Sequence, residues 1–215
     1  MKARLRVTAV VLLALLLASS CTRPPFSLMG THSSLASVYH LDREGSLTDK
    51  YESLGVFIVS EGDASLQMEV TSPDGMSTWL FPAEKRNVAD QDYYGKSGLT
   101  LGRWMRLPRG EWSLRVLNSD GRTLTDQFTV QQGPAPSSFH HHLDAEEGTL
   151  VLDEGFNEYG LQLLDAKGRE LYRSTTTEHR IELTSLYSKW DEVRFVGIAW
   201  YDDPSLQSMI VWYDL

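Results

Sequence analysis

The run "FHHHLDAEEG" at residues 139–148 gathers side chains that commonly bind metal ions. If residues 140–144 are extended, His140, His142 and Asp144 project from one face, because side chains alternate along a strand. Two imidazoles and a carboxylate can bind Zn²⁺, and Glu146 or Glu147 could then act as a base on metal-bound water. The run lacks the spacing of known zinc-protease motifs, such as two His four residues apart with an intervening Glu. We therefore predict no cofactor and no enzyme, with a zinc-dependent hydrolase as the alternative.

Cys21 is the only cysteine in the 215 residues, so the chain cannot form an internal disulfide. Before it come three basic residues within the first six positions, an almost uniformly apolar run over 7–18, and the small residues Ala18, Ser19 and Ser20. This order is typical of a secretory signal peptide. The apolar run is too short for a permanent spanning helix, which needs about 20 residues.

The stretch "LLLASSC" (15–21) resembles the lipobox of bacterial lipoproteins. The resemblance implies cleavage between Ser20 and Cys21, a diacylglyceryl thioether on the Cys21 sulfur, and an acyl group such as palmitate on its freed amine. Two or three acyl chains hold a protein stably, because each buried methylene contributes about 0.8 kcal/mol. Thr22 follows the cysteine where an Asp would imply retention in the inner membrane. The resemblance thus implies a cell-envelope protein anchored by lipid, with the outer membrane favoured and the leaflet left open.

The charge of the chain argues against nucleic acid as a partner. The net charge is −9, and removal of residues 1–20, which contain three basic and no acidic residues, would lower it to −12. Such a chain repels phosphate backbones, and it contains no basic patch with interleaved aromatic residues. We expect the partners to be the membrane, through the lipid, and another envelope protein or a glycan.

Short apolar or alternating runs separated by turn residues predict an all-β fold. Examples are "LGVFIVS" (54–60), "SLQMEVT" (65–71) before the turn "SPDG", and "LTLGRWMRL" (99–107). "SLASVYHL" (34–41) and "TSLYSKW" (184–190) are interpreted as short helical segments, and 83–98 as a polar connection. The Pro- and Gly-rich stretch "QQGPAPSS" (131–138) indicates a linker.

We therefore expect two small antiparallel β-sandwich-like domains. The predicted division is a signal peptide (1–20), a lipidated cysteine and tether (21–45), domain 1 (46–132), a linker (133–138) and domain 2 (139–215).

Two sequence similarities bear on these domains. The segment 107–130 resembles the closing hairpin of bacterial immunoglobulin-like modules, which implies a binding or spacer module without catalytic residues. The segments "LRVLNSDGRTL" (114–124) and "LQLLDAKGREL" (161–171) align at an offset of 47. The alignment is explained either by an internal repeat or by two hairpins that need the same glycine turn.

The six tryptophans are expected to lie mostly in the core. In "VRFVGIAWYD" (193–202), Phe195, Ala199 and Tyr201 face one way, and the intervening apolar side chains face the other. A strand that is apolar on both faces is either central between layers or buried against a partner. Tyr201, Asp202 and Asp203 are the predicted exposed binding tip.

Together these patterns predict a membrane-anchored envelope lipoprotein that acts as a non-catalytic binding or assembly module. A metal-dependent hydrolase at His140, His142 and Asp144, or a purely structural spacer, are the alternatives.

Overall fold

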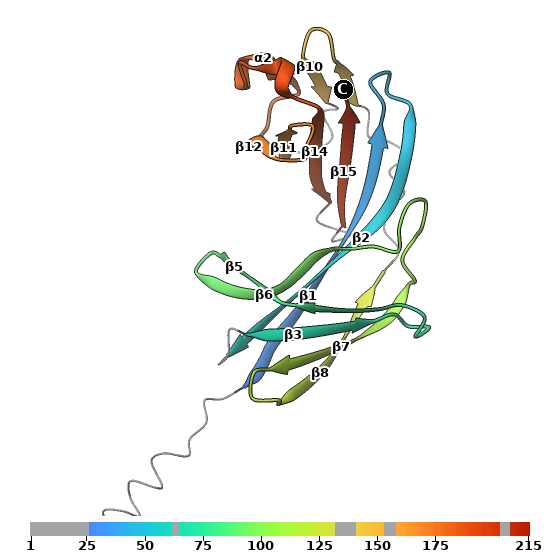
Figure 1. The fold of residues 1–215 in the computed structure, drawn as a ribbon, viewed down its shortest axis with the longest axis vertical. Coiled ribbons are helices and arrows are strands. Elements are labelled where there is room, and N and C mark those ends of the chain that lie inside the picture. Colours follow the sequence, from blue (N-terminus) through green and yellow to red (C-terminus); the bar gives the residue numbers. More distant parts are fainter. Residues whose placement is uncertain (1–25, 62–64, 132–140, 153–157, 203–206) are drawn as a thin grey trace, which may run out of the picture.

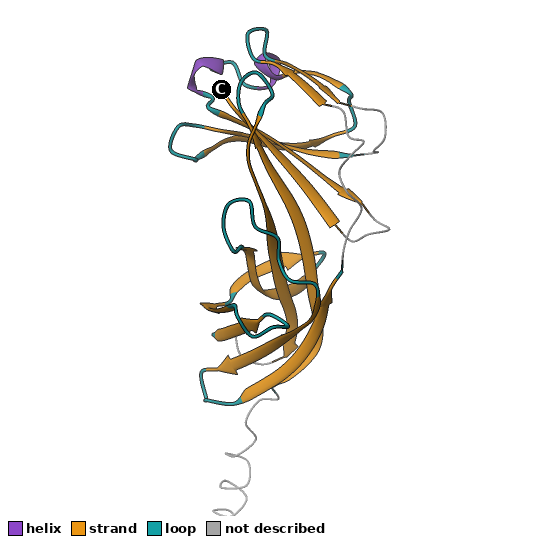
Figure 2. Ribbon diagram, turned by 90° about the vertical axis from the view of Figure 1, so that its right-hand side faces the viewer, coloured by secondary structure: helices purple, strands orange, loops and turns teal. Residues whose placement is uncertain are grey.

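The computed structural model describes residues 26–61, 65–131, 141–152, 158–202 and 207–215. This part of the chain is almost entirely β-structure, which confirms the predicted all-β, sandwich-like class. The strands form two lobes that follow one another along the long axis of the molecule (Figures 1 and 2). None of the described helices is long and apolar enough to cross a membrane.

Two long strands, β1 (Ser27–Leu41) and β2 (Leu47–Glu61), run through both lobes (Figure 1). They pair with each other in antiparallel fashion along almost their whole length. The predicted tether is therefore wrong from Ser27 onward, and so is the predicted helix at 34–41. β1 is rich in Ser, Thr, Gly and His, and its strand conformation comes from pairing with partners that are distant in sequence.

One sheet of eight strands extends through the molecule in the order β12-β11-β14-β15-β1-β2-β6-β5. β1 pairs in parallel with β15 only over Leu35–Leu41. This C-terminal half of β1 therefore belongs to the second lobe, and the N-terminal half belongs to the first. The remaining strands of this sheet are β5 (Glu84–Val88), β6 (Gln91–Leu99), β11 (Tyr159–Leu164), β12 (Glu170–Thr176), β14 (Phe195–Asp202) and β15 (Gln207–Asp214). The hairpin of β5 and β6 replaces the polar connection expected at 83–98.

The first lobe is a sandwich of β1-β2-β6-β5 against a sheet in the order β4-β3-β7-β8. The second sheet consists of β3 (Leu66–Thr71), β4 (Thr78–Pro82), β7 (Gly110–Asn118) and β8 (Thr123–Val130). Its buried side chains alternate with exposed ones and meet those of β2 and β6 in one core. Trp112, fully buried, stacks between Trp79 and Phe128 at ring-centroid distances of 5.6 and 6.3 Å.

The second lobe packs β11, β14 and β15 against a small sheet in the order β13-β10-β9. That sheet consists of β9 (His141–Asp144), β10 (Thr149–Leu152) and β13 (Arg180–Glu182). The short helix α2 (Leu183–Leu186) and the single 3₁₀ turn η1 (Trp190–Glu192) follow β13, close to the predicted helical segment. β1 contributes Leu35 to the first core and Leu41 to the second. The boundary predicted at residue 46 therefore falls inside the hairpin that both lobes share.

The segment 100–109 forms the joint between the lobes, not the strand expected over 99–107. It runs beside the free edge of β2, where the Trp104 N–H donates to the Lys50 carbonyl and the Glu52 N–H to the Met105 carbonyl. The Glu52 carboxylate, almost buried, accepts hydrogen bonds from both terminal nitrogens of Arg109 at 2.7 and 2.6 Å and from the Leu107 N–H at 2.8 Å. Burial alone would raise the pKa of Glu52, but these hydrogen bonds hold it below its ordinary value.

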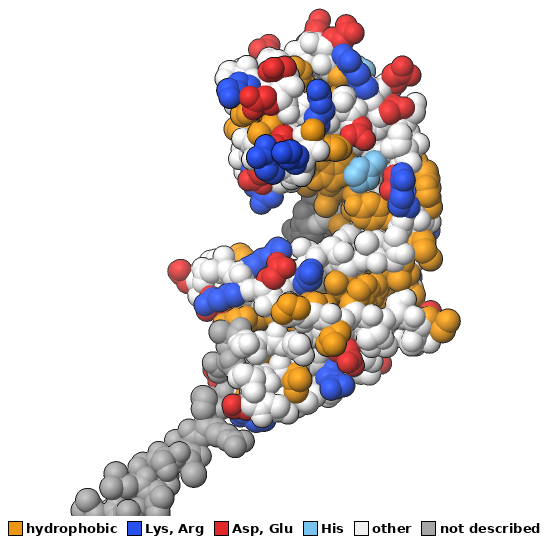
Figure 3. All heavy atoms as spheres, in the orientation of Figure 1, with side chains coloured by type: hydrophobic (Ala, Val, Ile, Leu, Met, Phe, Trp, Pro, Cys, Tyr) orange, Lys and Arg blue, Asp and Glu red, His pale blue; other side chains and the backbone are white. Residues whose placement is uncertain are grey.

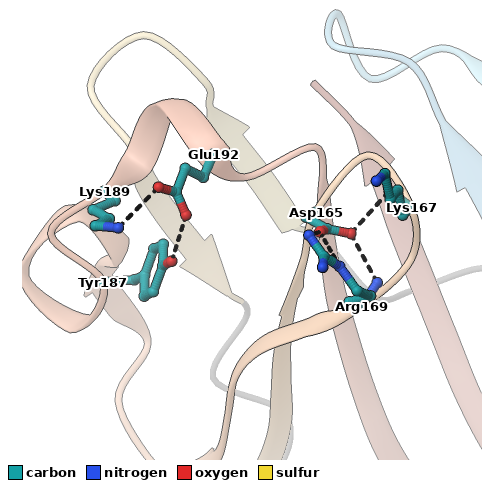
Figure 4. Close-up of polar contacts among 6 residues, drawn as sticks. All are labelled: Asp165, Lys167, Arg169, Tyr187, Lys189 and Glu192. Carbon is teal, nitrogen blue, oxygen red and sulfur yellow. Dashed lines mark hydrogen bonds and ion pairs between the residues drawn. The ribbon is translucent and has the colours of Figure 1, made fainter.

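Three hairpin turns share one hydrogen-bonding scheme. In each, the side-chain oxygen of Asp42, Asn118 or Asp165 accepts from the N–H groups two and four residues later. The third following residue is a glycine with φ between 73° and 84°. Figure 4 shows the turn at Asp165, where Arg169 also pairs with the carboxylate. Because the same turn joins β1 to β2, the similarity of 114–124 to 161–171 follows from turn geometry without a duplicated domain.

Candidate functional site

β14 has the two apolar faces expected from its sequence. Val196, Ile198 and Trp200 are buried in the core of the second lobe. Phe195, Gly197 and Ala199 lie on the opposite face of the strand. We call this side of the second-lobe sheet, away from that core, the outer face.

The cross-strand registers place two rows of residues on the outer face. One row runs Asp49, His40, Trp212, Gly197, Gln162, Arg173, and the next runs Tyr51, Val38, Ile210, Ala199, Gly160, Thr175. The middle of both rows is small or apolar, whereas the β12 end is polar. In Figure 3, hydrophobic side chains gather over β15, β1 and β2, where the surface turns into the hollow between the lobes.

Trp212 covers Gly197 with the flat face of its indole. A Cβ atom on Gly197 would lie within 2.8 Å of three contiguous ring carbons, Cε3, Cζ3 and Cη2. A point at the ring edge would approach one carbon much more closely than its two neighbours, so comparable distances to all three place the glycine beneath the ring face. One face of the half-buried indole therefore rests on the sheet, and the other is directed outward.

Beside Trp212 is an open depression of about 480 Å³, which we call the Trp212 trough. The small residues Gly160, Gly197 and Ala199 line its middle, and Ile210 and Trp212 border it on the β15 side. Gln162, Arg173 and Thr175 line the opposite side. The trough exists because two glycines and an alanine occupy positions where larger side chains would fill the sheet surface.

Toward β2 the outer face becomes aromatic. The His40 and Tyr51 rings stack at a centroid distance of 5.9 Å. Burial raises the pKa of Tyr51, and the negative charge of Asp49 adds to the increase. Tyr51 therefore presents a neutral phenol at ordinary pH.

The predicted metal cluster is only partly within the described residues, because His140 lies outside them. His142 and Asp144 share one face of β9, and the His142 side chain is exposed. Asp144 accepts the Glu146 and Glu147 N–H groups at 3.0 and 2.9 Å, and the bond from Glu147 is the main cause that lowers its pKa. Within the described ranges no three His, Cys, Asp or Glu side chains come together as a metal site. Zinc binding at these residues stays the untested alternative to the predicted absence of a cofactor.

Sequence reasoning missed the middle histidine of this run. His141 points opposite to His142, toward the core, and its Nδ1 forms a hydrogen bond with the Tyr213 hydroxyl. Burial raises the pKa of Tyr213 far above its ordinary range. Alternation along β9 was the available signal, since only one side of the strand can face the solvent.

The other predicted residues are placed in part. Tyr201 and Asp202 end β14, whereas Asp203 lies outside the described residues. Ser20 and Cys21 also lie outside them.

The expectation that most tryptophans are core residues is confirmed for Trp112 and Trp200, with Trp79 and Trp190 packed against the two cores. Trp104 is 56% exposed.

No family model matches this chain, and no curated protein matches it either.

Proposed function

We propose that the chain is a lipid-anchored lipoprotein of the bacterial cell envelope whose folded part is a non-catalytic binding module. The observation that carries the binding role is the outer face of the second lobe. An antiparallel sheet usually presents polar residues on the face that it turns to water. Here the same strand buries Val196 and Ile198 in the core, and on its other face it carries Gly197 under an outward-facing tryptophan. A purely structural spacer has no need of such a face.

The strand order of the first lobe supports the immunoglobulin-like resemblance as part of this proposal. Lettered A to G in chain order, with C′ for β4, the sheets β1-β2-β6-β5 and β4-β3-β7-β8 become ABED and C′CFG. This is the strand order of immunoglobulin sandwiches. The segment 107–130 contains the F and G strands, β7 and β8, which form the closing hairpin. In the proposal, this lobe is the module that holds the second lobe away from the membrane.

The order of residues at the N-terminus supports the anchor, and a labelling experiment tests it. Cells that express the full chain are fed an alkyne analogue of palmitate. The wild-type protein should be labelled, and Cys21→Ala should lose all labelling, because the cysteine supplies both the sulfur and the amine that are acylated. Equal labelling of the two proteins would refute the anchor.

Hydroxyl-radical footprinting tests the binding role without assuming a ligand. Trp212 should be oxidised several-fold more slowly in intact envelopes than in the purified full-length protein, because a bound component covers its outward face. Trp104, exposed but outside the trough, is the matched control and should react equally in both samples. Equal oxidation of Trp212 in the two samples would refute the binding role.

A further inference from the structure

The spacing between Trp212 and the polar residues of the trough limits the size of the ligand group that can contact both. Neighbouring strands are about 4.8 Å apart. The Trp212 ring lies over Gly197 on β14, so Gln162 on β11 is about one strand spacing from the ring and Arg173 on β12 about two. A six-membered sugar ring stacked on the indole would direct hydroxyl groups toward these polar side chains.

The polar side of the trough is already organised. Gln162 Nε2 donates to Glu170 Oε2 at 2.7 Å, and Arg173 Nε pairs with the same oxygen at 2.9 Å. The Gln162 amide oxygen consequently points away from Glu170. An amide, a carboxylate and a guanidinium side by side offer adjacent hydrogen-bond donors and acceptors. Neighbouring hydroxyls on a sugar, each both donor and acceptor, match such an array.

The charges in the trough favour an uncharged ligand. Arg173 is the one basic residue that lines the trough, and the carboxylate of Glu170 neutralises its charge. The chain as a whole carries a net charge of −9, which repels acidic polymers. A lipid acyl chain would bury the polar side without satisfying its hydrogen bonds, which costs free energy.

We propose that the Trp212 trough binds a neutral glycan, with one pyranose ring stacked on the outward face of Trp212 and its hydroxyls hydrogen-bonded to Gln162, Glu170 and Arg173. This inference rests on the proposed binding function and names its ligand class. The C–H-rich face of a pyranose loses water when it packs on the indole, while the equatorial hydroxyls keep hydrogen-bond partners at the rim. The volume of about 480 Å³ is within the usual range for small-ligand sites.

The test uses the full-length lipidated protein in a detergent without a sugar headgroup. An array of uncharged oligosaccharides identifies binders, with N-acetylchitotriose, maltotriose, cellotriose and mannotriose as the soluble probes for calorimetric titration. At least one neutral oligosaccharide should bind saturably. Its affinity should fall at least tenfold in Trp212→Ala and several-fold in Gln162→Ala. Trp212→Tyr keeps an aromatic face and should retain most of the affinity, and Trp104→Ala should bind like the wild type.

Two results would overturn the inference: no neutral oligosaccharide binds the wild type at millimolar concentration, or Trp212→Ala and Gln162→Ala bind as tightly as the wild type. If Trp212→Ala fails to fold, Gln162→Ala on the exposed rim decides the question. Protection of Trp212 in envelopes together with an absence of glycan binding would point to a protein partner. That combination refutes the glycan and leaves the proposed binding function standing.

Discussion

Each lobe has an open depression of about 480 Å³ on an outer sheet face, and the two differ in chemistry. In the first lobe the depression is lined mainly by polar side chains, namely Glu69, Thr71, Ser113, Arg115, Thr125, Asp126 and Gln127. In the second lobe the depression is lined by glycine and alanine in its middle and by Ile210 and Trp212 on one side. Polar side chains are expected on the face of an antiparallel sheet that is exposed to solvent. The lining of the second depression is explained neither by solvation nor by core packing, and this difference is the reason for the proposed binding role of the second lobe.

The Glu52–Arg109 pair at the joint between the lobes is expected to have the largest effect on stability. Glu52→Gln leaves Arg109 partly buried without its counter-charge, so the free energy of unfolding should fall by about 3 kcal/mol. Glu69→Gln is the matched control, because Glu69 pairs with Arg115 at 3.6 Å on the exposed face of the first lobe. It should cost less than about 0.5 kcal/mol. Urea denaturation at pH 7 measures both.

The pH dependence identifies the charge as the cause. The pKa of Glu52 is lower in the folded protein than its ordinary value, so the carboxylate stabilises the fold above the unfolded pKa of about 4.3. This stabilisation is lost as the pH falls through the lowered folded value. The difference between the wild type and Glu52→Gln should therefore be complete at pH 7 and shrink below about pH 4. An equal difference at pH 7 and pH 3 would mean that shape, and not charge, makes the joint.

Two small substitutions, one on the outer face of each lobe, should differ in their effect on stability. Gly197→Ala places a methyl group against the Trp212 ring, which must lift from the sheet. We expect a loss of about 2 kcal/mol and a change in near-ultraviolet circular dichroism. Ser113→Ala, at an exposed position beside the first depression, should stay within about 0.5 kcal/mol of the wild type. Equal effects of the two substitutions would contradict the flat packing of Trp212.

The sequence predicts the parts of the fold that depend on local pattern. Alternation in "SLQMEVT" predicts β3, and the turn residues "SPDG" predict the reversal into β4. The two apolar faces of β14 are also read directly from "VRFVGIAWYD". These predictions succeed because strand periodicity and glycine turns involve only near neighbours along the chain.

The parts that fail depend on distant partners. β1 contains too few apolar residues to be recognised as a strand, and it is held by β2 on one side and by the far end of the chain, β15, on the other. The five residues of β5 are all exposed, so no periodicity marks them. The trough is hidden for the same reason, since Trp212, Gly197 and Gln162 meet only through the pairing of β15, β14 and β11.

The smallest expected effect on stability is at Trp104, the second tryptophan that reaches the surface. Trp212 lies flat on a glycine, whereas Trp104 is 56% exposed and has a φ of 61°, in the left-handed region that glycine favours. A side chain in that region costs about 1 kcal/mol. Trp104→Gly should therefore be more stable than Trp104→Ala by about 1 kcal/mol, because both remove the indole and only glycine relieves the backbone.

Thermal denaturation of the two Trp104 variants measures this difference, and the wild type shows what the indole itself contributes. If Trp104→Gly is also more stable than the wild type, the strain at residue 104 outweighs what the indole contributes to stability. If the wild type is the most stable of the three, the buried part of the indole outweighs the strain, and Trp104 serves the joint alone. Either result leaves Trp212 as the tryptophan that the fold lays flat toward solvent. Equal stability of the glycine and alanine variants would contradict the strained conformation at Trp104.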